Sequence, residues 1–147
     1  MSSQPHPEAT PRRRIEAQCA DRGTQAVVSG CVALLGGDRS DRQLIISLGG
    51  SSARQILLGN SRADEMLWLR VWATRGLLWA WDGRAVDSLR GALLDDAWRV
   101  REMAAKVVAR HLVGDLLTNV ATLRGDPVAR VRHAAERAVT RRAVAKA

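Results

Sequence analysis

The stretch that decides the fold is residues 95–108, DDAWRVREMAAKVV, in which an aspartate is followed five and six residues later by an aliphatic residue and an arginine. The same arrangement begins at Asp64 and at Asp126, so it recurs at intervals of 31 residues. A fixed period of this length is typical of proteins built from stacked repeats. The aliphatic and arginine pairs are Leu69-Arg70, Val100-Arg101 and Val131-Arg132.

Each copy of the pattern predicts a helix that starts at its aspartate. The carboxylate can accept hydrogen bonds from N–H groups of the first turn, and its charge suits the positive end of the helix dipole. Pro127, directly after Asp126, stands where proline is tolerated because its missing N–H would have been unpaired anyway. Val100, Ala104 and Val107 then follow at helical period. Each of these amphipathic helices needs a neighbour to cover its apolar face.

A second, shorter apolar stretch precedes each of the later helices. Val86 and Leu89 reappear one period later as Leu117 and Val120, so each unit holds two helical segments. The chain has 147 residues, 46% of them hydrophobic, which is enough to fill one small core. It has no alternating runs of the kind that strands need. We therefore expect an all-α fold.

The motif D-x-x-x-x-[VL]-R-x-x-A at the start of the second helix of a helical hairpin resembles a HEAT repeat, particularly the short bacterial PBS-lyase HEAT-like type. The resemblance covers residues 62–144. It implies a short α-solenoid of antiparallel helix pairs, in which the Asp and Arg of adjacent units form a ladder between repeats. By this resemblance the Asp/Arg ladder is structural and consists of Asp64, Arg70, Asp95, Arg101, Asp126 and Arg132.

We expect a single helical repeat domain over residues 15–147, preceded by a flexible arm over residues 1–14. The arm is polar, holds three of the four prolines and ends in three arginines, which is the composition of a solvated tail. Its arginines are also candidates for a phosphate contact. The clear repeat units are expected at residues 63–81, 83–112 and 113–144.

Residues 15–62 are expected to form a degenerate helical cap. Helices are predicted at 25–35 and 41–48, followed by a turn at 49–52. The positions one period before Asp64, Leu69 and Arg70 are Ala33, Asp38 and Arg39, and we assign no clear repeat there. Terminal units of solenoids are usually atypical because they present a capping face to water.

Charge suggests where a partner would bind. The net charge is +8, and residues 99–147 supply most of it, with 11 basic and 4 acidic side chains. Cations recur on one stripe of each of the last two long helices, and by the resemblance these stripes adjoin on the concave surface. Such a patch attracts phosphate backbones or acidic protein faces, whereas the simpler and favoured interpretation is a solvated outer face. The candidate basic stripe consists of Arg99, Lys106, Arg110, Arg130, His133, Arg137 and Arg141.

The aromatic residues are all tryptophans, because the chain contains neither Tyr nor Phe. Trp72 lies on the predicted core face of its helix. Trp68 and Trp79 fall on the stripe that is basic in the later repeats. We expect the cap to bury them, and a contact with a partner is the alternative, because exposed aromatic residues often mark interfaces.

Catalysis finds little support in the sequence. The histidines, His6, His111 and His133, are scattered, and no Ser/His/Asp or Cys/His arrangement is present. Cys19 and Cys31 form no CxxC pair and suit a reduced intracellular protein. We therefore expect no enzyme activity, no metal and no cofactor. The lyase and DNA glycosylase activities of related repeat proteins are not carried over, because no bilin pocket or dedicated catalytic cleft is specified.

The function expected from the sequence is that of a non-catalytic interaction or scaffold module for another protein with an acidic or mixed surface. The alternative is nucleic-acid binding through the Arg-rich helix face near the carboxyl end. The chain has no secretory apolar core and no run of ~18 apolar residues, so we expect a cytoplasmic protein without a membrane segment.

Overall fold

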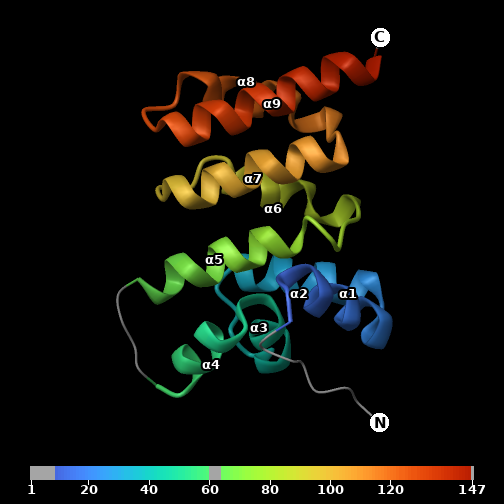
Figure 1. Cartoon of the computed structure of the whole chain (residues 1–147), viewed down its shortest axis with the longest axis vertical. Coiled ribbons are helices and arrows are strands. Elements are labelled where there is room, and N and C mark those ends of the chain that lie inside the picture. Colours follow the sequence, from blue (N-terminus) through green and yellow to red (C-terminus); the bar gives the residue numbers. More distant parts are fainter. Residues whose placement is uncertain (1–8, 60–63, 147) are drawn as a thin grey trace. The chain divides into compact units, whose positions relative to one another are not determined.

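A computed structural model of the chain describes residues 9–59 and 64–146. These residues form helices and connecting turns, with no strand among them, so the all-α prediction is confirmed for this part of the chain (Figure 1). The chain divides into two compact units, Met1–Ala85 and Val86–Ala147, where the sequence analysis expected one domain. We call them unit 1 and unit 2.

The described residues of unit 1 form five α-helices and one short 3-10 helix. They are α1 (Pro11–Arg22), α2 (Thr24–Leu35), α3 (Arg42–Gly49), α4 (Ser51–Leu57), α5 (Glu65–Gly76) and η1 (Gly83–Ala85). The helices predicted at 25–35 and 41–48 are α2 and α3. The turn predicted at 49–52 is confined to Gly50, whose φ of 63° lies in the left-handed region that favours glycine, because Gly49 ends α3 and Ser51 begins α4.

Helix α1 was not among the helices predicted from the sequence, and its first residues fall within the segment expected to be an arm. Pro11 occupies the first helical position, and the Thr10 side chain accepts a hydrogen bond from the Arg13 amide at 3.2 Å. The arm predicted for residues 1–14 is therefore wrong for residues 11–14, which form the first turn of α1. Residues 1–8 lie outside the described residues.

Two arginines bind the carboxyl end of α3. Arg14 is only 7% exposed and donates from Nε to the Ser47 carbonyl at 2.8 Å, and Arg75 donates from Nη2 to the Leu48 carbonyl at 2.7 Å. These carbonyls lie at the negative end of the helix dipole, which favours cations. Burial lowers the pKa of Arg75, and the nearby charge of Arg14 lowers it further. Arg14 is thus part of the scaffold of unit 1.

The core of unit 1 forms where α5 packs on α2 and α3. A Cβ atom on Gly76 would lie 2.6 Å from Leu48 Cδ2 and 3.0 Å from Cys31 Sγ, so the close approach of α5 requires glycine there. Cys31 is fully buried, and burial raises its pKa to about 12. It therefore acts as a small apolar core residue, and both cysteines are free thiols.

Unit 2 contains the same arrangement of a short helix followed by a long helix two times. It contains α6 (Val86–Ala92), α7 (Trp98–His111), η2 (Gly114–Leu116), α8 (Leu117–Thr122), η3 (Leu123–Gly125) and α9 (Ala129–Lys146). Helices α7 and α9 run alongside each other (Figure 1). Val100, Ala104 and Val107 on α7 and Val131 and Ala135 on α9 are buried, as their helical period predicts. None of the described helices is long and apolar enough to cross a bilayer.

Candidate functional site

The repeated aspartates of unit 2 stabilise the turns before the helices and do not cap the helices themselves. Asp95 Oδ1 accepts from the Ala97 amide at 2.9 Å, and Asp126 Oδ1 accepts from the Val128 amide at 2.9 Å. Helices α7 and α9 begin only afterwards, at Trp98 and Ala129. The prediction that these helices start at the aspartates is therefore wrong by three residues. Asn and Asp favour such turns because their side chains bond to the backbone two residues on.

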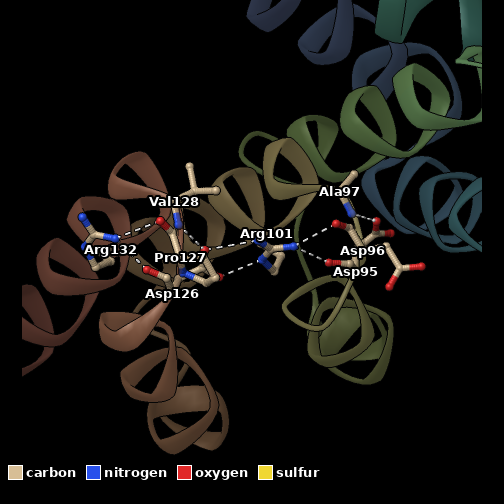
Figure 2. Close-up of polar contacts among 8 residues, drawn as sticks. All are labelled: Asp95, Asp96, Ala97, Arg101, Asp126, Pro127, Val128 and Arg132. Atoms are coloured by element: carbon tan, nitrogen blue, oxygen red, sulfur yellow. Dashed lines mark hydrogen bonds and ion pairs between the residues drawn. The ribbon is translucent and has the colours of Figure 1, made fainter.

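Arg101 joins the two turns (Figure 2). Its Nε and Nη2 atoms donate to Asp126 Oδ2 and Oδ1 at 2.8 and 3.1 Å, and its Nη1 donates to the carbonyls of Asp95 and Asp96 at 2.8 and 3.0 Å. The planar guanidinium suits this two-pronged contact with a carboxylate. Arg101 therefore fixes the start of α7 relative to the start of α9.

Arg132 repeats half of this arrangement one period later. Its Nη1 donates to the carbonyls of Asp126 and Pro127 at 2.7 and 3.1 Å, which are the counterparts of the Asp95 and Asp96 carbonyls (Figure 2). The arginine of each helix thus closes the turn in front of its own helix. In Arg101 the remaining guanidinium nitrogens also reach the aspartate of the following turn.

Asp126 is held in its charged form by these contacts. It is only 7% exposed. Burial opposes ionisation, but the hydrogen bonds from Arg101 and from the Val128 amide outweigh it and lower the pKa of Asp126. Asp126 and Arg101 are therefore hydrogen-bonded within the chain, and Arg132 adds two further bonds from its Nη1 atom.

The first copy of the motif is built differently. Asp64 is exposed, makes no side-chain capping bond, and is followed directly by the first residue of α5. Its neighbour Glu65 is buried, with Oε2 3.6 Å from Nη2 of Arg39. Arg39 stands one period before Arg70, at a position that the sequence analysis assigned to no repeat. The structure thus reveals an arginine and carboxylate pair here, displaced by one residue from the expected aspartate.

The two halves of the basic stripe meet at Glu102, which the sequence analysis did not single out as a site residue. Glu102 lies on α7 and is 8% exposed. Arg130 on α9 donates from Nε to Glu102 Oε2 at 2.7 Å, and Lys106 Nζ lies 3.6 Å from Oε1. A nearly buried carboxylate therefore neutralises part of the stripe. Glu102 lies on the same stripe of its helix as Arg99 and Lys106, and this placement was the sequence signal that could have identified it as a site residue.

Trp98 lies beside this ion cluster. The guanidinium carbons of Arg99 and Arg130 lie 4.4 and 5.4 Å from the centre of its ring. Cations at these distances are attracted to the ring face. The half-buried indole and the two arginines form a surface that is both apolar and cationic. We call Trp98, Arg99, Glu102, Lys106 and Arg130 the Trp98 cluster.

The other members of the basic stripe continue from this cluster. His133, Arg137 and Arg141 are exposed along α9, and Arg110 is exposed near the end of α7. Arg137 and Arg141 form no ion pair with any residue that the structure describes. We call three exposed residues of α9, His133, Arg137 and Arg141, the α9 basic face.

The predicted aromatic contact residues lie in unit 1, and both are half-buried. The ring centres of Trp68 and Trp72 are 6.4 Å apart. Both rings line a cavity of about 520 Å³, together with residues of α4 and the start of α5. The expected burial of Trp68 and Trp79 is therefore only partial, and Trp68 faces a cavity.

The histidines do not gather at a site. His111 is half-buried in the last turn of α7, His133 is exposed on α9, and His6 lies outside the described residues. Over residues 9–59 and 64–146, no group of three or more His, Cys, Asp and Glu side chains is arranged to hold a metal ion.

No protein-family model matches the chain, and neither a characterised protein nor a solved structure is significantly similar to it. The resemblance to HEAT-like repeats therefore depends on the residues of the chain itself.

Proposed function

We propose that the protein is a non-catalytic helical interaction module of the HEAT-like type, which binds an acidic surface of a partner protein through the Trp98 cluster and the α9 basic face. The observation that carries this proposal is that the guanidinium carbons of Arg99 and Arg130 lie 4.4 and 5.4 Å from the centre of the Trp98 ring. Tryptophan and arginine are the residues that most often dominate the binding energy of protein interfaces.

The repeated geometry of unit 2 supports the HEAT-like part of the proposal. Helices α7 and α9 follow equivalent aspartate turns, and Arg101 and Arg132 close those turns with the same pair of carbonyl contacts. The short helices before them also recur, because η1 and η2 begin at Gly83 and Gly114. A two-helix unit repeated at a fixed interval is the element from which a solenoid is built.

The charge of the surface supports an acidic partner. Glu102 neutralises only the inner part of the basic stripe, whereas Arg137 and Arg141 remain exposed on α9. Electrostatic attraction of this kind mainly increases the rate of association and the selectivity for oppositely charged partners. The proposed partner therefore presents carboxylates around an apolar centre that covers Trp98.

Nucleic-acid binding is the second candidate function, and the same exposed arginines favour it. Arginine side chains along one helix face can contact successive phosphates, which gives affinity without sequence specificity. Binding of this kind weakens steeply as salt increases, because each phosphate contact releases counterions. Strong salt dependence and indifference to sequence would distinguish it from a protein interface centred on Trp98.

The test compares the wild-type chain with three variants, namely a face variant, a charge-matched control and Trp98→Ala. The face variant is Arg137→Glu/Arg141→Glu, and the charge-matched control is Arg13→Glu/Arg42→Glu, which changes two exposed arginines in first turns of unit 1 helices. All four proteins are immobilised and exposed to nuclease-treated cell extract, and helicity is checked by circular dichroism. We expect proteins of acidic surface to be retained by the wild type and the control but lost by the face variant and by Trp98→Ala.

The nucleic-acid alternative is measured with the same proteins. Mobility shifts with DNA and RNA oligonucleotides at about 50 mM salt detect phosphate binding. Retention by the wild type and the control, with loss in the face variant alone, would favour the second function. If neither nucleic acid binds at this salt concentration, the second function is excluded. Equal protein retention by all variants would exclude the first.

A further inference from the structure

Unit 2 contains an arginine whose donors the proposed function does not use. Arg132 and Arg101 each donate from Nη1 to two carbonyls of the turn before their own helix, at 2.7 and 3.1 Å from Arg132 and at 2.8 and 3.0 Å from Arg101. These paired contacts hold the two guanidinium groups in equivalent positions on α9 and α7. Because a side chain that is already held loses little further entropy on binding, Arg132 is preorganised for a ligand.

The remaining guanidinium nitrogens distinguish the two arginines. Nε and Nη2 of Arg101 donate to Asp126 at 2.8 and 3.1 Å. The same two atoms of Arg132 have no hydrogen-bond or ion-pair partner among the residues that the structure describes, and they are not buried. Figure 2 shows Arg101, Asp126 and Arg132 following one another in that order. A further carboxylate can therefore bind Arg132 as Asp126 binds Arg101.

The helix face around Arg132 corresponds to a face that is buried on α7. Ala105 and Val108 lie on the stripe of α7 that carries its repeat arginine, and both are buried where α7 packs against α9. One period later, Glu136 is exposed and Val139 is half-buried. This stripe of α9 is therefore open to solvent in the described part of unit 2. We call Arg132, Glu136 and Val139 the Arg132 face.

The charges of the Arg132 face select one class of ligand. The pair of Arg101 and Asp126 shows that a carboxylate fits the two free donors, with the two-pronged geometry that guanidinium groups favour. A phosphate backbone would be attracted by Arg132 but repelled by Glu136, which forms no ion pair with any residue that the structure describes. The fitting ligand therefore carries a carboxylate for Arg132 and a cation for Glu136.

The pair within the chain also indicates how the ligand is built. Asp126 lies in a turn three residues before α9 begins at Ala129, and α9 then packs against α7. A carboxylate in the same position relative to Arg132 brings the helix that follows it alongside α9. An acidic turn followed directly by a helix therefore fits this face better than an isolated aspartate or an extended acidic segment.

We propose that the Arg132 face binds a helix of another protein that opens with an aspartate turn. The aspartate accepts from Nε and Nη2 of Arg132, and a basic residue of the same helix faces Glu136. The inference goes beyond the proposed function, because Arg130 of the Trp98 cluster and Arg132 point about 200° apart around α9. The two faces can therefore be occupied separately.

The experiment uses a synthetic peptide of about 20 residues, which is long enough to form a helix. The peptide opens with Asp-Pro-Val, as residues 126–128 do, and continues with Ala, Gln and Lys. The matched peptide opens with Asn-Pro-Val. Binding to the full chain is followed through the Nε–H signal of Arg132 in ¹H–¹⁵N NMR spectra. We expect a saturable shift with the Asp peptide and about tenfold weaker binding of the Asn peptide, which lacks the charge.

Variants test the role assigned to Arg132. Arg132→Gln should remove the preference for the Asp peptide, whereas the control Arg124→Gln, at an exposed position elsewhere in unit 2, should keep it. Circular dichroism checks that both variants are folded. Because the two peptides are also compared on the wild type, the test still decides if Arg132→Gln is unstable. Arg137→Glu/Arg141→Glu should leave the preference unchanged, so that this proposal and the proposed function can fail separately.

Two further measurements separate the proposed partner from other occupants of the Arg132 face. Analytical ultracentrifugation of the wild type detects a second copy of the chain, and titration with inorganic phosphate detects a phosphate site. A saturable preference for the Asp peptide that depends on Arg132 supports the proposal. It is overturned if neither peptide binds at up to about 1 mM, if both bind equally, if folded Arg132→Gln protein retains the preference, or if only phosphate or a second copy occupies Arg132.

Discussion

Asp126 in unit 2 and Glu65 in unit 1 are both nearly buried carboxylates that face an arginine from the preceding period, yet their surroundings differ. Asp126 accepts two hydrogen bonds from Arg101 and one from a backbone amide. Glu65 has one arginine at 3.6 Å and a buried oxygen without a donor among the described residues. At repeat spacing, the carboxylate of unit 2 therefore has hydrogen-bond donors at both oxygens, whereas that of unit 1 has only an arginine at longer distance.

The largest effect is expected from Arg101→Ala. The substitution leaves Asp126 and the carbonyls of Asp95 and Asp96 without their donor, so we expect a loss of about 1–3 kcal/mol in unfolding free energy. Urea denaturation followed by circular dichroism measures the loss. Hydrogen exchange should quicken in peptides of α7 and α9 but not in those of α2 and α3. An unchanged denaturation midpoint would show that this contact does not stabilise unit 2.

Asp126→Asn is expected to have the next largest effect, with about 1–2 kcal/mol lost at neutral pH. Because the pKa of Asp126 lies below its ordinary value of 3.8, its ionic contacts stabilise the fold above that value. This stability is lost as the pH falls through the lowered pKa. The wild type and the variant should therefore converge in stability at acid pH, as measured by urea denaturation across a pH series. A difference that persists in acid would contradict the assignment.

Glu65→Met should change stability much less. The substitution removes a favourable charge from the first turn of α5, which is worth about 0.3–1 kcal/mol, but it also removes a buried oxygen without a donor. Because these terms oppose each other, we expect a net change below about 1 kcal/mol in either direction. Thermal denaturation beside Asp126→Asn makes the comparison direct. Equal losses in the two variants would mean that the two carboxylates are equivalent after all.

Asp64→Ala should have the smallest effect. Asp64 is exposed and its side chain makes no capping hydrogen bond, although it occupies the same position in the 31-residue pattern as Asp126. We expect a change within about 0.5 kcal/mol, the usual range for surface substitutions. A loss as large as that of Asp126→Asn, in the same denaturation assay, would show that the aspartate at this repeated position has a structural role.

Much of the fold could be predicted from sequence patterns that belong to single helices. The apolar period placed α2 and α3 within one residue of their observed starts and ends. The aspartate motif located α7 and α9, although the turns extend three residues before each helix begins. Helix α1 was not predicted, and its first turn was assigned to an arm because prolines and arginines suggested one. The Thr10-Pro11 pair was nevertheless a recognisable helix start.

The candidate sites were harder to predict because they depend on contacts between distant segments. The stripe on α9 identified Arg130, but its pairing with Glu102 on α7 depends on how the two helices align. The burial of Glu65 likewise depends on α4 and on Arg39, which belong to the part of the chain with the weakest repeat pattern. Periodicity gives the face on which a residue lies, whereas a neighbouring segment decides which partner it meets.

The position of Trp98 also gives unit 2 its own optical signal. The other four tryptophans, at positions 68, 72, 79 and 81, all belong to unit 1, and the chain has no Tyr or Phe. Fluorescence from unit 2 therefore comes from one indole, with Arg99 and Arg130 beside its ring. The difference between the emission of the wild type and that of Trp98→Leu isolates this indole. Its fluorescence can therefore report the unfolding of unit 2, or the binding of a partner to its surface, without any added label.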